Sequence, residues 1–156
     1  MKSVPIPAPP PPSSAGPGND MNTLLTAHFA ITWMIVGLIW VIQIIVYPQF
    51  LRVGAAEFRV YHFAHCLRIG FMIVPMFLIE LGTAAWLFYD GTRGMPFLIS
   101  LAMFGIIGLS TVLFQAPIHT HLMNGRDDVQ IRRLIATNWL RTFAWTTRGI
   151  CLCFIV

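Results

Sequence analysis

The sequence predicts an all-α integral membrane protein, in which a four-helix bundle follows a disordered, proline-rich N-terminal tail. Of the 156 residues, 56% are hydrophobic and only 10% are charged, whereas a soluble domain carries about 25% charged residues. The apolar runs are long enough for three or four bilayer crossings of about 20 residues each. Polar residues recur within these runs at helical spacing, which indicates one polar face per helix. Since a soluble fold cannot bury this much apolar surface, the bilayer is the expected solvent.

The chain divides into two parts. Residues 1–20 contain an unbroken run from Pro9 to Pro12 and too few apolar side chains to form a core, so we expect a disordered tail. Residues 21–156 are expected to form one helical domain. Its four spans are predicted at about residues 23–47, 69–89, 95–116 and 140–156.

The first span, residues 23–47, is expected to end at Pro48, because proline disfavours helical geometry in the residue before it. Its polar residues His28, Thr32 and Gln43 fall within an arc of about 60° at 100° per residue. They should therefore lie on one face of this helix.

The second helix is expected to begin near Ala55, after a break at Gly54, and to cross the membrane over residues 69–89. Pro75 should kink it, because the proline ring clashes with the carbonyl four residues earlier. Glu80 lies on the same face as His62 and His65. An ionisable residue in an apolar span is costly and therefore marks a candidate site.

The third span, residues 95–116, follows a glycine-rich turn at residues 90–94 and is expected to be interrupted by Pro117. Its polar residues again share one face; they are Ser100, Thr111 and Gln115.

The last helix is expected to run from Asp128 to the end of the chain, with residues 140–156 as the fourth span. Asn124-Gly125 indicates a turn before it. Asp127 is predicted to be the N-cap, with Gln130 three positions later in capping-box register.

The arginines in the connections predict the orientation of the helices. The first and third connections carry several arginines each, whereas the second carries only Arg93. By the positive-inside rule the first and third connections face the cytoplasm and both termini lie outside. The expected location is the bacterial inner (cytoplasmic) membrane.

Charge and cysteine content argue against two other classes. The net charge of +4 arises from basic residues beside apolar runs, where membrane topology places them, so no nucleic-acid partner is expected. Cys66, Cys151 and Cys153 provide no disulfide framework and no Cys-x-x-Cys motif. They are interpreted as packing residues.

Because all four helices carry a polar face, these faces should meet inside the bundle, where lipid cannot reach them. Glu80 and Arg148 lie at a similar depth, at about 1.5 Å of rise per residue. Each charge would cost about 2.5–3.5 kcal/mol in hydrocarbon. We therefore expect Glu80 and Arg148 to pair.

Three interpretations are open for the polar residues at the cytoplasmic ends of the helices. In the first, histidines bind a metal or haem: His62 and His65 are three residues apart on one helix face, and His119 or His121 completes the set. A polar pocket in an apolar bundle could instead hold an aromatic or quinone-like substrate. Alternatively, the polar groups only lock the helices together and bind lipid phosphates.

For the enzymatic interpretation, His65 or His119 would be the general base, and Asn138 and Arg141 would bind an oxyanion. The substrate pocket would be formed by Gln43, His62, Arg68, Glu80, Gln115, Trp145 and Arg148. No cofactor is required by the sequence, and haem or a metal is the alternative. The expected partners are the lipid bilayer and an apolar aromatic small molecule.

Two stretches carry a resemblance to known proteins. One extends from Trp40 to Phe50 and continues with Tyr61-His62-x-x-His65. The other is Gln115-Ala-Pro117-Ile-His119, followed by Asn138-Trp139-x-Arg141-Thr142. Together they resemble small bacterial four-helix membrane proteins of unknown function.

The second stretch also resembles, more loosely, the family that contains anthrone oxygenase. In that family asparagines stand where this chain has Gln115 and His119. The resemblance implies a four-span bundle and suggests a small oxidoreductase of the cofactor-independent monooxygenase type, acting on an aromatic or quinoid substrate. A non-enzymatic accessory subunit of a membrane complex, or a haem- or metal-binding membrane protein, is the alternative.

Overall fold

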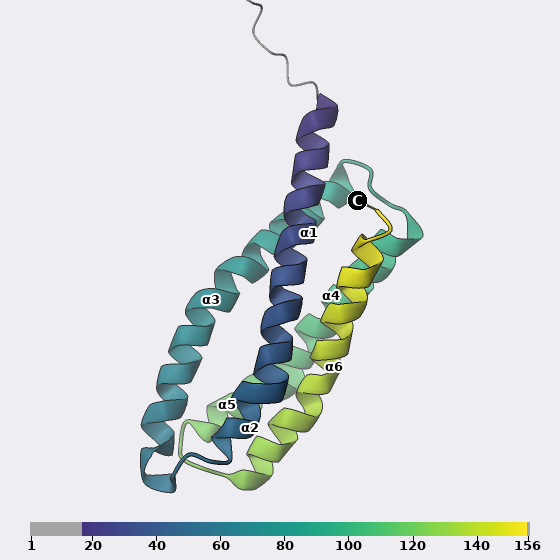
Figure 1. Ribbon diagram of the computed structural model, residues 1–156. Coiled ribbons are helices and arrows are strands. Elements are labelled where there is room, and N and C mark those ends of the chain that lie inside the picture. The colour runs from purple at the N-terminus through teal and green to yellow at the C-terminus, as the bar shows by residue number, and fades with distance from the viewer. Residues whose placement is uncertain (1–16, 156) are drawn as a thin grey trace, which may run out of the picture.

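The computed structural model describes residues 17–155, and this part of the chain is helical apart from short connections. Four rods form an up-and-down bundle (Figure 1). The elements are α1 (Pro17–Val41), η1 (Ile42–Val46), α2 (Tyr47–Phe50), α3 (Ala55–Tyr89), α4 (Met95–Ser110), η2 (Thr111–Gln115), α5 (Ala116–Leu122) and α6 (Asp128–Leu152).

The first helix begins earlier than expected. The predicted tail covered residues 1–20, but α1 already begins at Pro17, and proline is well suited to the first turn of a helix because its missing N–H needs no partner there. The rest of the predicted tail, residues 1–16, lies outside the described residues.

The four rods are not packed equally. α6 packs against both α4 and α1, whereas α3 packs mainly against α1. The α2–α3 and α5–α6 connections lie together at one end of the bundle, here called the lower end (Figure 1). The start of α1, the α3–α4 turn and the end of α6 lie at the opposite, upper end.

Two predicted helix breaks are wrong. Pro48 does not end the first rod, which continues to Phe50, and Pro117 does not interrupt the third rod, which continues to Leu122. In both rods a five-residue π-helix, η1 or η2, directly precedes the short helix that carries the proline. A π-turn widens the helix locally, so it can accommodate a ring that lacks an N–H.

The helix α3 is continuous over its 35 residues, with Pro75 inside it. Its axis curves along its length (Figure 1). Gly54 stands at the N-cap as expected, and Gly91 has a φ of +104° in the turn that follows α3. That positive φ explains why the turn uses glycine.

The N-cap of α6 is confirmed. The Asp127 carboxylate accepts hydrogen bonds from the backbone N–H groups of Val129 (3.0 Å) and Gln130 (3.1 Å). The helix ends at Leu152 and is followed by a turn, so it stops short of the chain end.

Within the described residues, three helical stretches are long and apolar enough to cross a membrane: Met21–Phe50, Ala55–Tyr89 and Met95–Leu122. By the same criterion α6 is not among them; it carries several arginines along its length.

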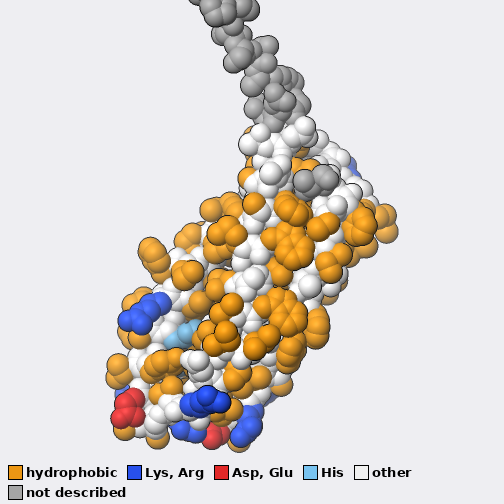
Figure 2. Space-filling model, viewed as in Figure 1, with side chains coloured by type: hydrophobic (Ala, Val, Ile, Leu, Met, Phe, Trp, Pro, Cys, Tyr) orange, Lys and Arg blue, Asp and Glu red, His pale blue; other side chains and the backbone are white. Residues whose placement is uncertain are grey.

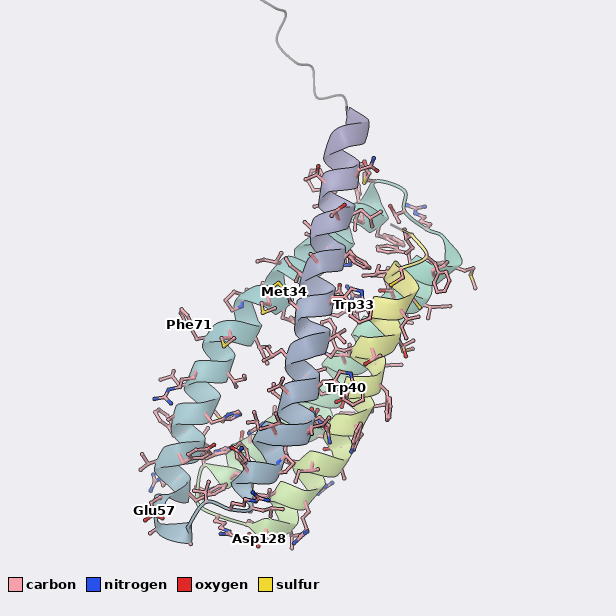
Figure 3. All side chains as sticks on the ribbon, viewed as in Figure 1. Trp33, Met34, Trp40, Glu57, Phe71 and Asp128 are labelled. Atoms are coloured by element: carbon pink, nitrogen blue, oxygen red, sulfur yellow. The ribbon has the colours of Figure 1, made fainter. Side chains whose placement is uncertain are left out.

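The polar faces of the helices point inward, as the spacing predicted. Buried polar side chains come from all four rods, and they are His28, Thr32, Gln43, His62, Glu80, Ser100, Ser110, Gln115, Asn138, Thr142 and Arg148. The visible outer surface is largely apolar, and charged side chains gather at the lower end (Figure 2). Glu57 and Asp128 mark this end, and the apolar side chain of Phe71 points away from α3 (Figure 3).

Candidate functional site: an apolar cavity between two polar clusters

A buried ion pair lies in the upper half of the bundle. Arg148 Nη2 of α6 donates to Glu80 Oε2 of α3 at 2.5 Å, and neither side chain has any exposed surface. This confirms the pairing of Glu80 with Arg148 that depth and helical phase predicted. It also confirms that the polar faces of α3 and α6 meet.

Side chains of α1 complete the surroundings of this pair. Thr32 donates to Glu80 Oε1, and Nε2 of His28 accepts from Arg148 at 3.1 Å. Nδ1 of His28 lies 2.7 Å from Thr83 Oγ1. Because Nε2 is the acceptor, the proton of a neutral His28 ring is assigned to Nδ1, which donates to Thr83.

Arg148 extends the cluster to α4. Its Nη1 donates to the backbone carbonyl of Ser100 at 3.0 Å, and its guanidinium lies over the Phe104 ring at 4.4 Å. We call His28, Thr32, Glu80, Thr83 and Arg148 the ion-pair network. It joins α1, α3, α4 and α6 through groups that hydrocarbon cannot satisfy.

A second cluster lies near the lower end and consists of two imidazoles and a thiol. His62 Nε2 lies 3.0 Å from His119 Nδ1. The Cys66 thiol lies 3.7 Å from each of these two nitrogens. We call His62, Cys66 and His119 the thiol–imidazole cluster. Its three atoms converge on one point from α3 and α5.

Aromatic and phenolic groups surround this cluster. The Tyr47 hydroxyl lies 3.1 Å from Nε2 of His119. The His65 ring lies beside the Phe50 ring, with centroids 4.9 Å apart, and beside the His119 ring, with centroids 6.2 Å apart. His65 is thus close to the cluster, and its ring packs edge-to-face against Phe50 and stacks beside His119.

A chain of polar groups joins the first rod to α6. Asn138 Nδ2 donates to Gln43 Oε1 at 2.8 Å, and Arg141 Nη1 donates to Asn138 Oδ1 at 3.2 Å. The Arg141 guanidinium also lies close enough to the Tyr47 hydroxyl to interact with it electrostatically. These contacts connect Arg141 to the surroundings of the thiol–imidazole cluster.

Both π-helices present a glutamine to α6. Gln43 of η1 donates to the Ile135 carbonyl at 3.1 Å, and Gln115 of η2 donates to Thr137 Oγ1 at 3.3 Å. Because a π-turn changes the direction of the residues within it, π-turns recur at functional sites. Here they place both amides against the same helix.

A cavity of about 440 Å³ lies between the four rods. Its wall is almost entirely apolar, and Arg141 is its one charged residue among those described. The lining residues are Ile35, Leu38, Ile39, Ile42, Ile73, Val74, Phe77, Leu78, Ile107, Gly108, Thr111, Val112, Arg141 and Trp145. Nε of Arg141 is buried and has no hydrogen-bond partner in the described structure.

The structure separates the predicted site residues into groups. Arg141 and Trp145 line the cavity, while Glu80 and Arg148 belong to the ion-pair network. The thiol–imidazole cluster contains His62 and His119, with His65 beside it. Gln43, Gln115 and Asn138 are buried between these groups and form hydrogen bonds between helices.

Two predicted residues lie elsewhere. Arg68 is exposed, because it stands at the edge of the polar arc on α3, and the neighbouring Met72 is 52% exposed on the same side. The prediction that Arg68 faces the interior is therefore wrong. His121 is also exposed and pairs with Asp127 at 3.0 Å, so it does not join His62 and His119.

Sequence reasoning did not assign three important residues to the site. Cys66 was interpreted as packing, although it stands four residues after His62, on the same helical face. His28 was recognised as polar but not connected to Glu80. Tyr47 was seen only as the residue before Pro48, and its contact with His119 depends on the π-helix η1.

Comparisons with family models, with curated proteins and with solved structures gave no match to this chain. The resemblance to the anthrone-oxygenase-like family therefore stays a prediction from the residues that carry it.

Proposed function

We propose that this chain is an integral membrane protein that crosses the bilayer four times. The support is its inverted pattern, with polar groups inside and large apolar side chains such as Phe71 (82% exposed) outside. α6 is the fourth crossing in this proposal, although it carries arginines. Arg148 is buried and Arg141 lines the cavity, whereas the outward side chains at the same depth include Phe143 and Ile150.

The charge distribution supports the orientation proposed here. Charged side chains gather at the lower end (Figure 2), where the α2–α3 and α5–α6 connections lie. We place this end in the cytoplasm by the positive-inside rule. Both termini are then outside, and the membrane is the inner membrane of a bacterium.

We further propose that the cavity binds an apolar aromatic or quinoid molecule and that the protein acts on it as a small oxidoreductase. The observation that carries this proposal is the cavity wall, which is apolar except for the Arg141 guanidinium and the Thr111 hydroxyl, which is bonded to the Ile107 carbonyl. Ligand sites of this volume are typically apolar, with a few polar groups that fix orientation. A ring system with one oxygen would place that oxygen at Arg141, where Nε has no partner.

The proposed reaction is of the cofactor-independent monooxygenase type, in which R₂CH₂ and O₂ give R₂C=O and H₂O. The substrate loses a proton, and its anion supplies electrons to O₂; one oxygen atom enters the product and the other leaves as water. Arg141 would stabilise the oxyanion of the substrate. His119 would be the base, reached through the Tyr47 hydroxyl that lies between Arg141 and His119.

Filling the cavity tests the binding proposal. Gly108 lines the cavity, and a Cβ placed on it meets no atom within 4 Å, so Gly108→Leu would project into the cavity. Gly37 is also open around its Cβ but faces outward, so Gly37→Leu is the matched control. With purified protein in detergent and anthrone as the probe, Gly108→Leu should abolish the part of the tryptophan fluorescence quenching that depends on Trp145, identified by its loss in Trp145→Phe, and Gly37→Leu should retain it.

Turnover tests the enzymatic proposal separately. Oxygen consumption with anthrone should be present in the natural chain and lost in Arg141→Ala, with the fold retained by circular dichroism. Quenching without oxygen consumption would leave a binding protein and overturn the enzyme. Equal quenching in Gly108→Leu and the natural chain would show that the cavity is not the binding site.

A further inference from the structure

We propose that His62, Cys66 and His119 form a binding site for a thiophilic transition metal, of the class of Zn²⁺ or copper. The site lies between α3 and α5, below the cavity. It differs from the histidine set that the sequence suggested, because Cys66 supplies the third ligand and His121 lies elsewhere. None of the three ligands belongs to the cavity wall. His119 is also the base in the proposed reaction, but the metal site is argued from its own geometry and does not rest on the proposed enzyme.

The distances between the three atoms match the spacing that a metal imposes. With metal–nitrogen bonds of about 2.0–2.1 Å and a metal–sulfur bond of about 2.3 Å, tetrahedral to trigonal angles separate the nitrogens by about 3.3–3.6 Å. The sulfur then lies about 3.5–3.8 Å from each nitrogen. The observed separations are 3.0 Å for the nitrogens and 3.7 Å for both sulfur–nitrogen pairs. A small widening of the nitrogen pair would complete the geometry.

The local folding explains why the ligands meet. His62 and Cys66 are four residues apart on α3, so both side chains leave the same helical face. His119 comes from α5, directly after the π-helix η2 and Pro117. The rotamers of the histidines are constrained by stacked rings, with the centroids of His62 and Phe58 5.6 Å apart.

Tyr47 provides an outer contact of the kind that metal-binding histidines have. Its hydroxyl lies 3.1 Å from Nε2 of His119, the nitrogen that points away from the cluster. If Nε2 carries the proton and donates to Tyr47, the lone pair of Nδ1 faces His62 and Cys66. Such partners set the tautomer and orientation of a ligating histidine.

The chemistry of the ligands selects the metal class. Two imidazoles and one thiolate favour Zn²⁺ and copper over Mg²⁺ and Ca²⁺, which require oxygen ligands. Binding requires the Cys66 thiol to release its proton to solvent and the proton on Nε2 of His62 to move to Nδ1. Three protein ligands leave one coordination position open, as in catalytic sites. When a metal is bound through Nδ1 of His119, the proton of this ring stays on Nε2. His119 cannot then act as the base of the proposed oxidation.

Cobalt titration of the full chain in detergent tests this site, because a cobalt–thiolate bond gives a charge-transfer absorption. The natural protein should bind one Co²⁺ with this absorption, and Zn²⁺ should displace it. Cys66→Ser should remove the absorption, whereas Cys151→Ser, at another half-buried cysteine, should leave it unchanged. His119→Gln should weaken binding more than 100-fold, whereas His121→Gln, on an exposed ring, should have no effect.

Each outcome decides the proposal. If Co²⁺ and Zn²⁺ do not bind, or bind equally to Cys66→Ser, the cluster is only a hydrogen-bonded histidine pair beside a packed thiol, and the proposal is overturned. The Cys66→Ser change replaces sulfur by oxygen at constant shape, so folding should persist; a thermal melt without metal checks this. Anthrone quenching is measured on the same samples, so failure of the metal site and failure of the cavity site are distinguished.

Discussion

The two polar clusters of this bundle differ in charge. In the ion-pair network, Glu80 and Arg148 are fully buried and oppositely charged. Thr32 and His28 of α1 and the Ser100 carbonyl of α4 form hydrogen bonds with them, and within this ion pair only Nε of Arg148 lacks a partner among the described residues. The thiol–imidazole cluster contains a buried histidine and two half-buried groups, a thiol and a second imidazole, and its three candidate ligand atoms lie within 4.8 Å of one another. The charges of the first cluster are paired with each other, whereas the second cluster offers three atoms that could hold a cation.

The difference indicates separate roles for the two ends of the interior. Removing one member of a buried ion pair leaves an unpaired charge, so such a pair resists change. Neutral imidazoles and a thiol tolerate burial better and can exchange protons for a metal. We interpret the upper cluster as the element that fixes the four helices and the lower cluster as the element that binds.

The largest expected effect comes from breaking the ion pair. Glu80→Gln and Arg148→Gln should each destabilise the fold by about 3–5 kcal/mol, because each leaves a buried group without its partner. Unfolding in detergent at increasing denaturant measures this loss. Arg68→Gln is the control on an exposed arginine and should stay within about 0.5 kcal/mol.

The double variant of Glu80 and Arg148 sharpens the same comparison. Because both charges are then absent, it should be more stable than the sum of the single losses predicts. Strictly additive losses would show that the two side chains act independently, contrary to the observed ion pair.

A smaller effect is expected from Thr32→Val. The Thr32 hydroxyl donates to the Glu80 carboxylate, and a hydrogen bond to a charged group contributes about 1.5–3 kcal/mol. The same unfolding assay applies, with Thr120→Val as the control, because Thr120 is exposed and bonds only within its own helix at 2.9 Å. Equal stability of the two variants would remove Thr32 from the network.

Tyr47→Phe should separate binding from stability in the lower cluster. Loss of the hydroxyl removes the partner of His119 Nε2 and should weaken cobalt binding by about 10–100-fold, while the melting temperature changes little. If the variant binds cobalt as tightly as the natural chain, Tyr47 does not orient His119.

The smallest effect concerns the start of α6, outside both clusters. Backbone N–H donation from Gln130 lowers the pKa of Asp127 below its ordinary value, with a further contribution from His121. The stabilisation is therefore present above the unfolded-state pKa of about 3.9 and is lost as the pH falls through the lower folded-state value. The protection factor of the Val129 amide, which is the intrinsic exchange rate divided by the observed rate, should fall over this range. Asp127→Ala should show low protection at every pH, and a protection factor that does not change with pH in the natural chain would contradict the cap.

Helical phase and depth were sufficient to predict the polar interior. The pairing of Glu80 with Arg148 follows from the period of 3.6 residues and the rise per residue, which are properties of any helix. The π-helices were not predictable from propensity, because they depend on how Pro48 and Pro117 are accommodated. As a result, both prolines were wrongly read as helix ends.

Contacts between helices distant in sequence limited the prediction of the site. Cys66 becomes a candidate metal ligand only because α5 places His119 against α3. The cavity likewise depends on how α3 packs beside the other rods. Arg68 was wrongly included in the site, whereas Cys66 was wrongly left out. A residue at the edge of a polar arc can face either the interior or the outside. The curvature of α3 is invisible to a helical projection that assumes a straight axis.

X-ray absorption at the zinc edge of the loaded full-length protein tests the central claim most directly. The account predicts one sulfur at about 2.3 Å and two imidazole nitrogens at about 2.0–2.1 Å, with the sulfur lost in Cys66→Ser and retained in Glu80→Gln under conditions where that variant remains folded. A spectrum with only nitrogen and oxygen neighbours, or one unchanged in Cys66→Ser, would contradict the claim that the lower cluster is a metal site.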